Sequence, residues 1–175
     1  AVLACAMAIE AGGQAAIMAP TDLLARQHAR SLAPLAEAAG IEWAILTGRE
    51  KGAARERILE GLASGRIRLL VGTHALFQGP VEFAELTLAV VDEQHRFGVH
   101  QRLALTAKGP ATDLLVMTAT PIPRTLMMSF FGDLDVSRLT EKPAGRQPIA
   151  TRLASADRMG EIVEALGRAI AEGQK

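Results

Sequence analysis

Short runs of hydrophobic residues recur along the chain and alternate with longer segments in which apolar and polar residues are mixed. The hydrophobic runs predict buried strands at residues 14–19, 41–46, 67–71, 86–91 and 114–117. Each run is apolar at nearly every position, as expected where helices cover both faces of a parallel sheet. The intervening segments predict helices at residues 1–11, 21–39 and 53–63, the second with a break or bend near Pro34. This alternation predicts an α/β fold built on a parallel sheet.

Glycine, proline and threonine residues mark the ends of these elements. Gly12 and Gly13 end the first helix, and Thr21 is placed to cap the second. Towards the other end, the proline- and glycine-containing segment 143–148 predicts a linker, and residues 157–172 predict a further helix. We therefore expect one α/β domain over residues 1–142, followed by a linker and the start of a second domain over residues 143–175.

The composition narrows the classes of protein that are compatible with this fold. Hydrophobic residues make up 49% of the chain, so a sizeable core is expected, and the 19 basic and 19 acidic residues balance. Any contact with nucleic acid must therefore depend on a local basic patch. The single cysteine, Cys5, excludes an internal disulfide and agrees with a reducing compartment such as the cytoplasm. No apolar run approaches the roughly 20 residues of a membrane-spanning helix. The apolar start lacks an initiator Met and a basic leader, so we expect a segment of a larger protein rather than a signal peptide.

The strongest chemical signal follows the strand predicted at 86–91, where Asp92 and Glu93 come directly after hydrophobic residues. A carboxylate at a strand end is suited to bind Mg²⁺, directly or through one of its waters, and we assign Asp92 this role. A second carboxylate beside a metal-bound phosphate can position and deprotonate a water molecule, which is the role expected of Glu93. Gln94 and His95 are placed to sense the phosphate state through hydrogen bonds. The alternative is an ordinary strand end with a solvated acidic turn.

Polar motifs also follow the other predicted strands, and their order along the chain resembles that of superfamily-two helicases. Asp92-Glu93-Gln94-His95 is similar to a DExH-type box, and Thr118-Ala119-Thr120-Pro121 comes after the next strand. Upstream, three further motifs resemble the elements by which these helicases contact a nucleic-acid strand, namely Ala19-Pro20-Thr21, Thr47-Gly48 and Gly72-Thr73-His74. The resemblance implies a RecA-like motor domain in which a set of residues couples ATP turnover to movement on nucleic acid. That set comprises Gln94, His95, Thr118, Ala119, Thr120 and Arg124.

A closer resemblance, covering essentially the whole chain, is to the RecG-type helicases of bacteria. It is carried by Leu46-Thr47-Gly48-Arg49, Gly72-Thr73-His74-Ala75-Leu76-Phe77-Gln78, Asp92-Glu93-Gln94-His95-Arg96-Phe97-Gly98, Met117-Thr118-Ala119-Thr120-Pro121-Ile122-Pro123-Arg124-Thr125-Leu126 and Gly132-Asp133-Leu134-Asp135-Val136-Ser137. The resemblance implies an enzyme that uses ATP and Mg²⁺ to move on duplex DNA and to remodel replication forks and Holliday junctions. Residues 1–142 would then be the first motor domain, truncated at its N-terminus, and residues 143–175 the linker and the start of the second. Branched or duplex DNA is the expected partner, with single-strand-binding protein as a further one, for a monomeric motor associated with the bacterial nucleoid and not with a membrane.

Two other interpretations stay open at this point. The transcription-repair coupling translocase shares the His-Arg-Phe-Gly and Thr-Ala-Thr-Pro-Ile-Pro-Arg segments, and a non-catalytic DNA- or protein-binding remnant would keep the fold without the ATPase. The chain contains no Gly-x-x-x-x-Gly-Lys-Ser/Thr sequence, the loop whose backbone N–H groups grip ATP phosphates. We therefore expect a sheet without the phosphate-loop strand, and a fragment that alone binds ATP poorly and neither hydrolyses it nor unwinds DNA.

The candidate DNA-binding residues lie in the three loops that resemble strand-contact motifs. Backbone N–H groups, hydroxyls and helix N-termini commonly bind phosphates, and Thr21 and Thr73 fit this chemistry. The superfamily often has Arg directly after the Pro-Thr pair, whereas this chain has Asp22, so Arg26 or Gln27 one turn later is expected to substitute. The alternative for both threonines is plain helix capping. The full candidate set is Pro20, Thr21, Arg26, Gln27, Gly48, Arg49, Gly72, Thr73 and His74.

Overall fold

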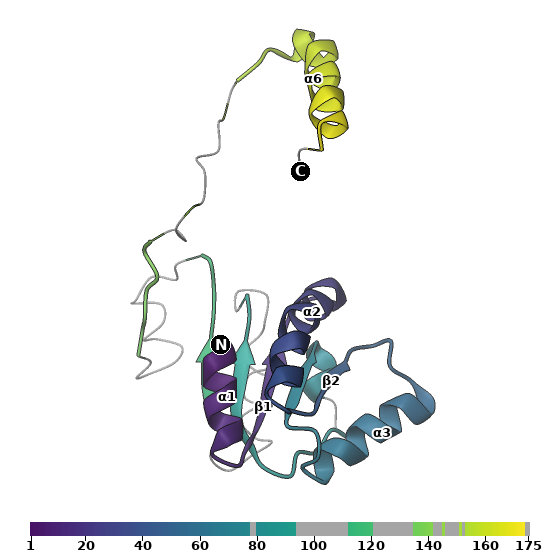
Figure 1. Cartoon of the computed structure of the whole chain (residues 1–175), viewed down its shortest axis with the longest axis vertical. Helices are drawn as coiled ribbons and strands as arrows, with labels where there is room; N and C mark the ends of the chain where they lie inside the picture. Colours follow the sequence, from purple (N-terminus) through teal and green to yellow (C-terminus); the bar gives the residue numbers. More distant parts are fainter. Residues whose placement is uncertain are drawn as a thin grey trace. The chain divides into compact units, whose positions relative to one another are not determined.

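A parallel sheet of five strands forms the centre of the first of two units into which the chain divides (Figure 1). The computed structural model describes residues 1–77, 80–93, 112–120, 135–141, 145, 151 and 153–173. The first unit spans Ala1–Leu126 and the second Met127–Lys175. The expected boundary between residues 142 and 143 lies inside the second unit and stays a prediction.

The strands follow the order β2-β3-β1-β4-β5 across the sheet, and every neighbouring pair is parallel. Their bounds are Gln14–Met18 (β1), Trp43–Leu46 (β2), Leu69–Gly72 (β3), Leu86–Val91 (β4) and Asp113–Val116 (β5). All five predicted strands are present, so the α/β fold class is confirmed. Two of them begin later than expected: the Ile41 N–H bonds to Ala36 at the end of the preceding helix, and the Ile67 N–H bonds to Gly61. Those backbone groups are already paired, so the ladder starts two residues further on in each case.

Helices cover both faces of the sheet, because successive side chains of each strand point to opposite sides. One face packs against α1 (Val2–Glu10) and α2 (Asp22–Ala38) through Ala15 and Ile17 of β1. The other packs Ala16 and Met18 against α3 (Gly52–Ala63) and the short 3-10 helix η1 (His74–Phe77). In Figure 1, α1 and α2 accordingly lie on the same side of the sheet. The central strands are buried on both faces, as their continuous hydrophobicity predicts.

Helix α2 continues through Pro34 as one element, so of the predicted break or bend a break is wrong, and a bend stays a prediction. A proline inside a helix removes one hydrogen bond and crowds the preceding turn. Ala29, Leu32 and Ala36 are all buried against the sheet on either side of Pro34. This packing on both sides of Pro34 stabilises the continuous helix despite the local cost of the proline.

The described part of the second unit contains a 3-10 turn (Ala156–Arg158, η3) followed by helix α6 (Met159–Ala171), close to the predicted helix. One stripe of this helix consists of exposed hydrophobic side chains, namely Met159, Ile162, Val163, Leu166 and Ile170. Their spacing is that of an amphipathic helix. Within the described ranges, none of the helices combines the length and the apolar character that crossing a bilayer requires.

Candidate ATPase and DNA-binding site

The carboxyl ends of the five parallel strands meet at one edge of the sheet, and the predicted motifs lie there. After β1 the chain continues to β2, at one end of the strand order. After β4 it continues to β5, at the opposite end. Such a reversal between two neighbouring strands opens a crevice, and ligands of open α/β sheets bind there. Asp92 follows β4 on this edge, and the loop before α2 follows β1.

Asp92 is held at the strand end by three hydrogen bonds. Its N–H donates to the Met18 carbonyl at 2.9 Å, which continues the pairing of β4 with β1 by one residue. Its Oδ1 accepts from the Glu93 N–H at 3.0 Å, and its Oδ2 lies 2.8 Å from Nε2 of His28 on α2. Glu93 has a φ of 52°, in the left-handed region that side chains other than glycine seldom adopt. The chain therefore leaves the extended conformation of β4 directly after Asp92.

The Asp92 carboxylate fits the chemistry of a Mg²⁺ ligand. An ionised carboxylate has about four lone-pair positions, and each oxygen of Asp92 accepts one of the hydrogen bonds described above, so acceptor capacity is left for an ion or its water. Among the described residues, no three His, Cys, Asp or Glu side chains converge as a ready-made metal cage. Mg²⁺ in phosphate-transferring sites is commonly bound by one or two carboxylates together with phosphates and waters, so a single strand-end carboxylate suits it.

Thr118 and Thr120 lie beside Asp92 at the same edge, as the motor interpretation requires. Strand β5 pairs with β4 so that Val116 is opposite Val91, and the Met117 N–H donates to the Val91 carbonyl at 2.8 Å. The Thr118 hydroxyl accepts from the Thr120 N–H at 3.2 Å, and the two hydroxyls lie 3.1 Å apart. Ala119, between them, is exposed. The Thr-Ala-Thr motif is thus a small hydrogen-bonded turn on the strand next to the acidic pair. Gln94, His95 and Arg124 lie outside the described residues.

The loop that follows β1 begins α2 at Thr21. The Thr21 hydroxyl accepts from the Leu24 N–H at 3.3 Å, which is the geometry of a helix cap, so the predicted capping role is confirmed. Pro20 is partly exposed, and Thr21 and Gln27 are exposed. A capped helix start on the ligand-binding edge leaves backbone N–H groups directed outward, where they favour an anion.

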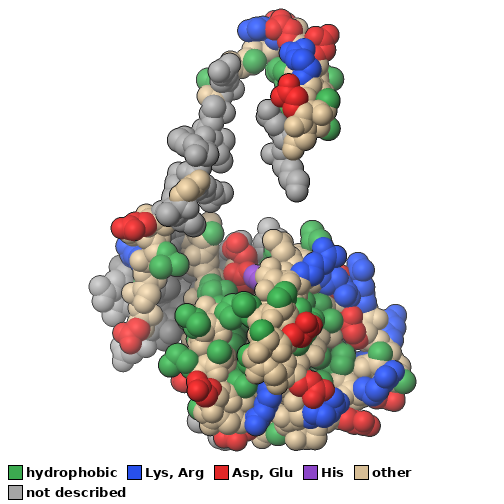
Figure 2. Space-filling model, viewed as in Figure 1, with side chains coloured by type: hydrophobic (Ala, Val, Ile, Leu, Met, Phe, Trp, Pro, Cys, Tyr) green, Lys and Arg blue, Asp and Glu red, His purple; other side chains and the backbone are tan. Residues whose placement is uncertain are grey.

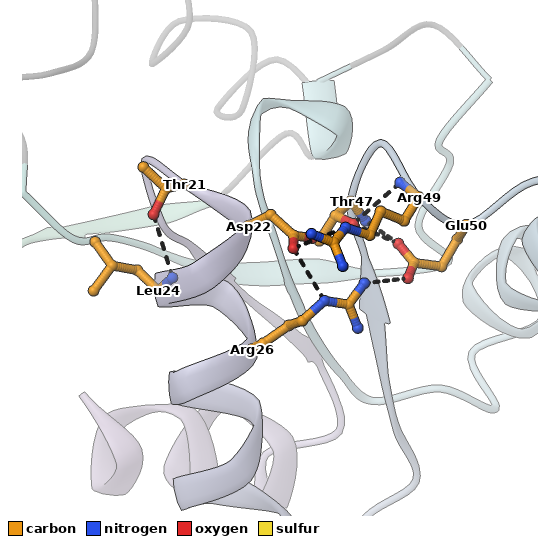
Figure 3. Close-up of polar contacts among 7 residues, drawn as sticks. All are labelled: Thr21, Asp22, Leu24, Arg26, Thr47, Arg49 and Glu50. Atoms are coloured by element: carbon orange, nitrogen blue, oxygen red, sulfur yellow. Dashed lines mark hydrogen bonds and ion pairs between the residues drawn. The ribbon is translucent and has the colours of Figure 1, made fainter.

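Next to this helix start lies a group of charged and polar side chains, which we call the Asp22 cluster. It consists of Asp22, Arg26, Thr47, Arg49 and Glu50 (Figure 3). Asp22 Oδ2 lies 3.1 Å from Nε of Arg26 and 3.2 Å from Nε of Arg49. Arg26 also reaches Glu50, at 2.9 Å, and the Thr47 N–H and hydroxyl donate to the other oxygen of Glu50 at 2.6 and 2.7 Å. The cluster therefore ties the first turns of α2 to the loop after β2.

Both carboxylates of the Asp22 cluster are stabilised in their charged form. The pKa of Asp22 lies below its ordinary value because of the Thr47 hydroxyl and then the Arg26 and Arg49 guanidinium groups. Burial alone would raise the pKa of Glu50, but the hydrogen bonds from Thr47 and Arg26 outweigh it, and the net pKa is lowered. Asp22 Oδ1 is buried with no hydrogen-bond partner among the described residues.

This arrangement changes the interpretation of two candidate DNA-binding residues. Arg26 is engaged by two carboxylates, so in this state its charge is neutralised within the protein rather than offered to a phosphate. Arg49 keeps a side chain that is 73% exposed while its Nε contacts Asp22. Of the two, Arg49 is the better placed to reach a DNA backbone. Figure 2 shows Lys and Arg side chains gathered over the side of the first unit that α2 and α3 form.

The remaining candidates differ in how much of their role the fold explains. A side chain at Gly72 would place its Cβ 2.0 Å from the Leu46 carbonyl oxygen, so glycine is required there by the close approach of β2. Thr73 is 5% exposed and donates its N–H to the same carbonyl at 3.3 Å, whereas His74 is exposed at the start of η1. Gly48 has no atom near the position of a Cβ and no left-handed backbone. The close approach of β2 thus accounts for Gly72, and the DNA-binding roles of Gly48 and His74 stay predictions.

Two residues of this site were not foreseen from the sequence, His28 and Glu50. His28 has no Cys or His at metal-ligand spacing, and nothing in the sequence links it to Asp92, 64 residues away. A helical periodicity analysis could have placed His28 one turn after Leu24, beside the buried stripe. The contact itself depends on β4 lying next to β1, which only the sheet order decides.

The fold and the acidic strand end define the class of this protein. Residues 1–129 match the family described as DEAD/DEAH box helicase, and the chain belongs to this family. Within it, the chain is similar to the ATP-dependent DNA helicase RecG of several bacteria. It is 50% identical to the RecG of Pasteurella multocida (strain Pm70) over 97% of this chain and 25% of that protein, and 48% identical to the RecG of Bacillus subtilis (strain 168) over 100% and 26%.

A solved structure agrees with these relatives. The structure of RecG bound to a three-way DNA junction superposes with a TM-score of 0.80 at 41% identity, over 98% of this chain and 23% of that one. The Mycobacterium smegmatis helicase Lhr, at 20% identity and a TM-score of 0.54, shares the fold. The resemblance to RecG-type helicases is therefore confirmed along the whole chain. The chain spans about a quarter of the length of the curated relatives it matches.

Proposed function

We propose that the protein containing this chain is an ATP-dependent DNA helicase or translocase that remodels replication forks and Holliday junctions in DNA repair and recombination. The observation that carries the proposal is the position of Asp92 and Glu93 at the switch between β1 and β4, on the same edge as Thr118 and Thr120, which follow β5. A carboxylate pair at this crevice is placed to act on a nucleotide's terminal phosphates. Similarity to RecG proteins over nearly the whole chain supports branched DNA as the substrate.

The catalytic roles follow from the two carboxylates. Asp92 would hold Mg²⁺, which when bound neutralises charge on the phosphates and orients them. Glu93, whose backbone has a left-handed φ of 52°, would accept a proton from the attacking water. Gln94 and His95 would sense the phosphate by hydrogen bonding. Thr118, Ala119, Thr120 and Arg124 would transmit the state of the nucleotide to the DNA-binding surface.

That surface would be the helix start of α2 together with the loops after β2 and β3. Thr21 and Pro20 present the N-terminal N–H groups of α2, and Arg49 adds an exposed positive charge. Gly48, Thr73 and His74 would contact the same strand from the neighbouring loops. Gln27 lies one turn along α2 and would reach the backbone beside them, and Gly72 would bring the loop close to it. Arg26 would contribute to DNA binding through its place in the Asp22 cluster.

The second unit would belong to the other half of the motor. The exposed apolar stripe of α6 is the face that a helix buries against a sheet. We propose that residues 143–175 form the linker and the beginning of a second motor domain, after a first motor domain that ends near residue 142. The intact motor would be a cytoplasmic monomer at the nucleoid, with single-strand-binding protein as a partner.

The test uses the full-length protein and its Asp92→Asn and Glu93→Gln variants. DNA-stimulated ATP hydrolysis should fall by about 100-fold or more in each, since a positioned base contributes roughly 100- to 10,000-fold. Unwinding of a three-way junction should fall in parallel, while junction binding without nucleotide should be retained. Hydrolysis by either variant at the wild-type rate would contradict the proposal. Equal activity on linear and branched duplexes would contradict the assignment of substrate.

A further inference from the structure

Helix α2 contributes a side chain to the acidic strand end that no motif of the family resemblance includes. Nε2 of His28 lies 2.8 Å from Oδ2 of Asp92, and the two side chains are 30% and 20% exposed. The contact joins α2, which covers one face of the sheet, to the end of β4 within the sheet. His28 sits between Ala25 and Ala29, which are both buried against the sheet, so packing fixes the backbone that carries the imidazole.

The chemistry of the pair determines its direction. An ionised carboxylate only accepts hydrogen bonds, so Nε2 of His28 carries the hydrogen and donates it to Oδ2. The Glu93 N–H donates to Oδ1 from the other side. One hydrogen bond leaves a carboxylate able to rotate about its Cβ–Cγ bond, whereas a donor on each oxygen holds its plane. The lone pairs that remain on both oxygens then point in set directions.

We propose that His28 is a positioning residue that orients the Asp92 carboxylate for its metal ion. The inference rests on the proposed function, in which Asp92 holds Mg²⁺. Donors to a metal-binding carboxylate set its orientation, and the loss of such partners commonly weakens metal binding by about 10- to 100-fold. His28 would act through Asp92 alone, without touching the ion or the nucleotide.

The position of His28 on α2 gives the contact a second consequence. The same helix carries the Thr21 cap and, at Asp22 and Arg26, the cluster that ties it to the loop after β2. The imidazole is therefore anchored to the helix whose first turn faces the proposed DNA strand. Its orienting effect on Asp92 needs no contact with the DNA.

The experiment compares His28→Gln with His28→Leu in the full-length protein. The side-chain nitrogen of glutamine reaches about as far as Nε2 of histidine and donates a hydrogen bond, whereas leucine has similar bulk and no donor. Binding of Mn²⁺ to the protein–ADP complex is measured by the electron paramagnetic resonance signal of the free ion. This readout does not depend on turnover. Glu37→Gln, at an exposed position further along α2, serves as the control.

We expect His28→Leu to bind Mn²⁺ about 10-fold or more weakly than wild type, and His28→Gln to stay within about 3-fold of it. Wild-type affinity in His28→Leu would overturn the inference. An equal loss in both variants would also overturn it, because the hydrogen bond would then not be the cause. Thermal unfolding of each variant identifies any that fails to fold, and the Gln variant keeps the comparison valid.

Asp92→Asn separates this inference from the proposed function. It should weaken Mn²⁺ binding at least as strongly as His28→Leu. An Asp92→Asn variant that binds Mn²⁺ normally would contradict the proposed function itself. Weak binding in Asp92→Asn with normal binding in His28→Leu would leave the proposed function standing and remove His28 from it.

Discussion

Gln14, at the amino ends of the strands, and the Asp22 cluster, at their carboxyl ends, use polar side chains in opposite ways. At the amino edge, Gln14 is fully buried, and its amide donates to the carbonyls of Leu62 and Ile67 at 2.9 and 2.7 Å and accepts from the Glu85 N–H at 2.8 Å. This side chain is neutral and its partners are backbone groups. At the carboxyl edge, the side chains of Asp22, Arg26 and Glu50 are charged, partly exposed and paired with one another, and Asp22 Oδ1 is buried with no partner among the described residues.

The contrast shows where stability and function reside in one sheet. Satisfied neutral hydrogen bonds in a dry environment hold three elements together and do not respond to ligands. Charged groups left partly exposed, with a strained backbone at Glu93, keep interactions available for a phosphate, a cation or DNA. Substitutions at the amino edge should therefore change stability, and substitutions at the carboxyl edge should mainly change activity.

The largest effect is expected for Glu93→Gln, which removes the proposed base. ATP hydrolysis should fall by about 100- to 10,000-fold. Hydrogen exchange at the β1 amides should change less than it does in Gln14→Leu. A Glu93→Gln protein with normal turnover and a loosened sheet would reverse the comparison between the edges.

Gln14→Leu should be the most destabilising change at the amino edge. It removes the side-chain partner of the Ile67 carbonyl and of the Glu85 N–H, whereas the Leu62 carbonyl still accepts from two backbone N–H groups. Each buried polar group left unpaired costs roughly 1–3 kcal/mol. We expect a loss of about 3 kcal/mol in the local stability of β1, measured by hydrogen exchange in the full-length protein. Gln27→Leu, at an exposed position, should change it by less than about 0.5 kcal/mol. Equal losses in the two variants would show that burial of the amide is unimportant.

Thr21→Ala removes the cap of α2 and should cost about 1 kcal/mol in the first turn of that helix. Exchange of the Leu24 amide measures it, and Thr21→Ser should keep the wild-type value because serine retains the hydroxyl. If junction affinity falls in Thr21→Ala and is restored in Thr21→Ser, the hydroxyl or the ordered helix start takes part in DNA binding. Unchanged affinity in both would remove Thr21 from the DNA-binding surface.

The smallest expected effect is a change in pH dependence in Glu50→Gln. The folded protein lowers the pKa of Glu50 below its ordinary 4.5, so the group stabilises the fold above that value, and this contribution disappears as the pH falls through the lowered pKa. The variant should therefore unfold at a lower temperature than wild type near neutral pH, and the difference should shrink as the pH falls below the ordinary pKa of a glutamate. A difference that is constant across this range would mean that the charge of Glu50 does not stabilise the fold. Glu37→Gln, exposed on α2, is the matched control.

Most of the fold could be predicted from the sequence because it depends on local patterns. The run at 86–91 corresponds residue for residue to β4, and Thr21 caps α2 as its position predicts. The predicted break at Pro34 failed because the helix packs against the sheet on both sides of that residue, and no local rule includes this packing. The acidic pair and the threonine motif were found because each follows its own strand directly. The Asp22 cluster and His28 could not be found in this way, since their partners come from other elements.

The sequence by itself determined which segments form buried strands, where the helices begin and end, and which residue types stand at the carboxyl ends of the strands. Hydrophobic periodicity and capping depend on neighbours a few residues apart, so they can be read along the chain. Only the tertiary structure decided that β1 lies between β3 and β4, and that His28 therefore meets Asp92 while Arg26 is enclosed by Asp22 and Glu50. Those contacts follow from the order of strands in the sheet, which sets distances between residues that are far apart in the chain.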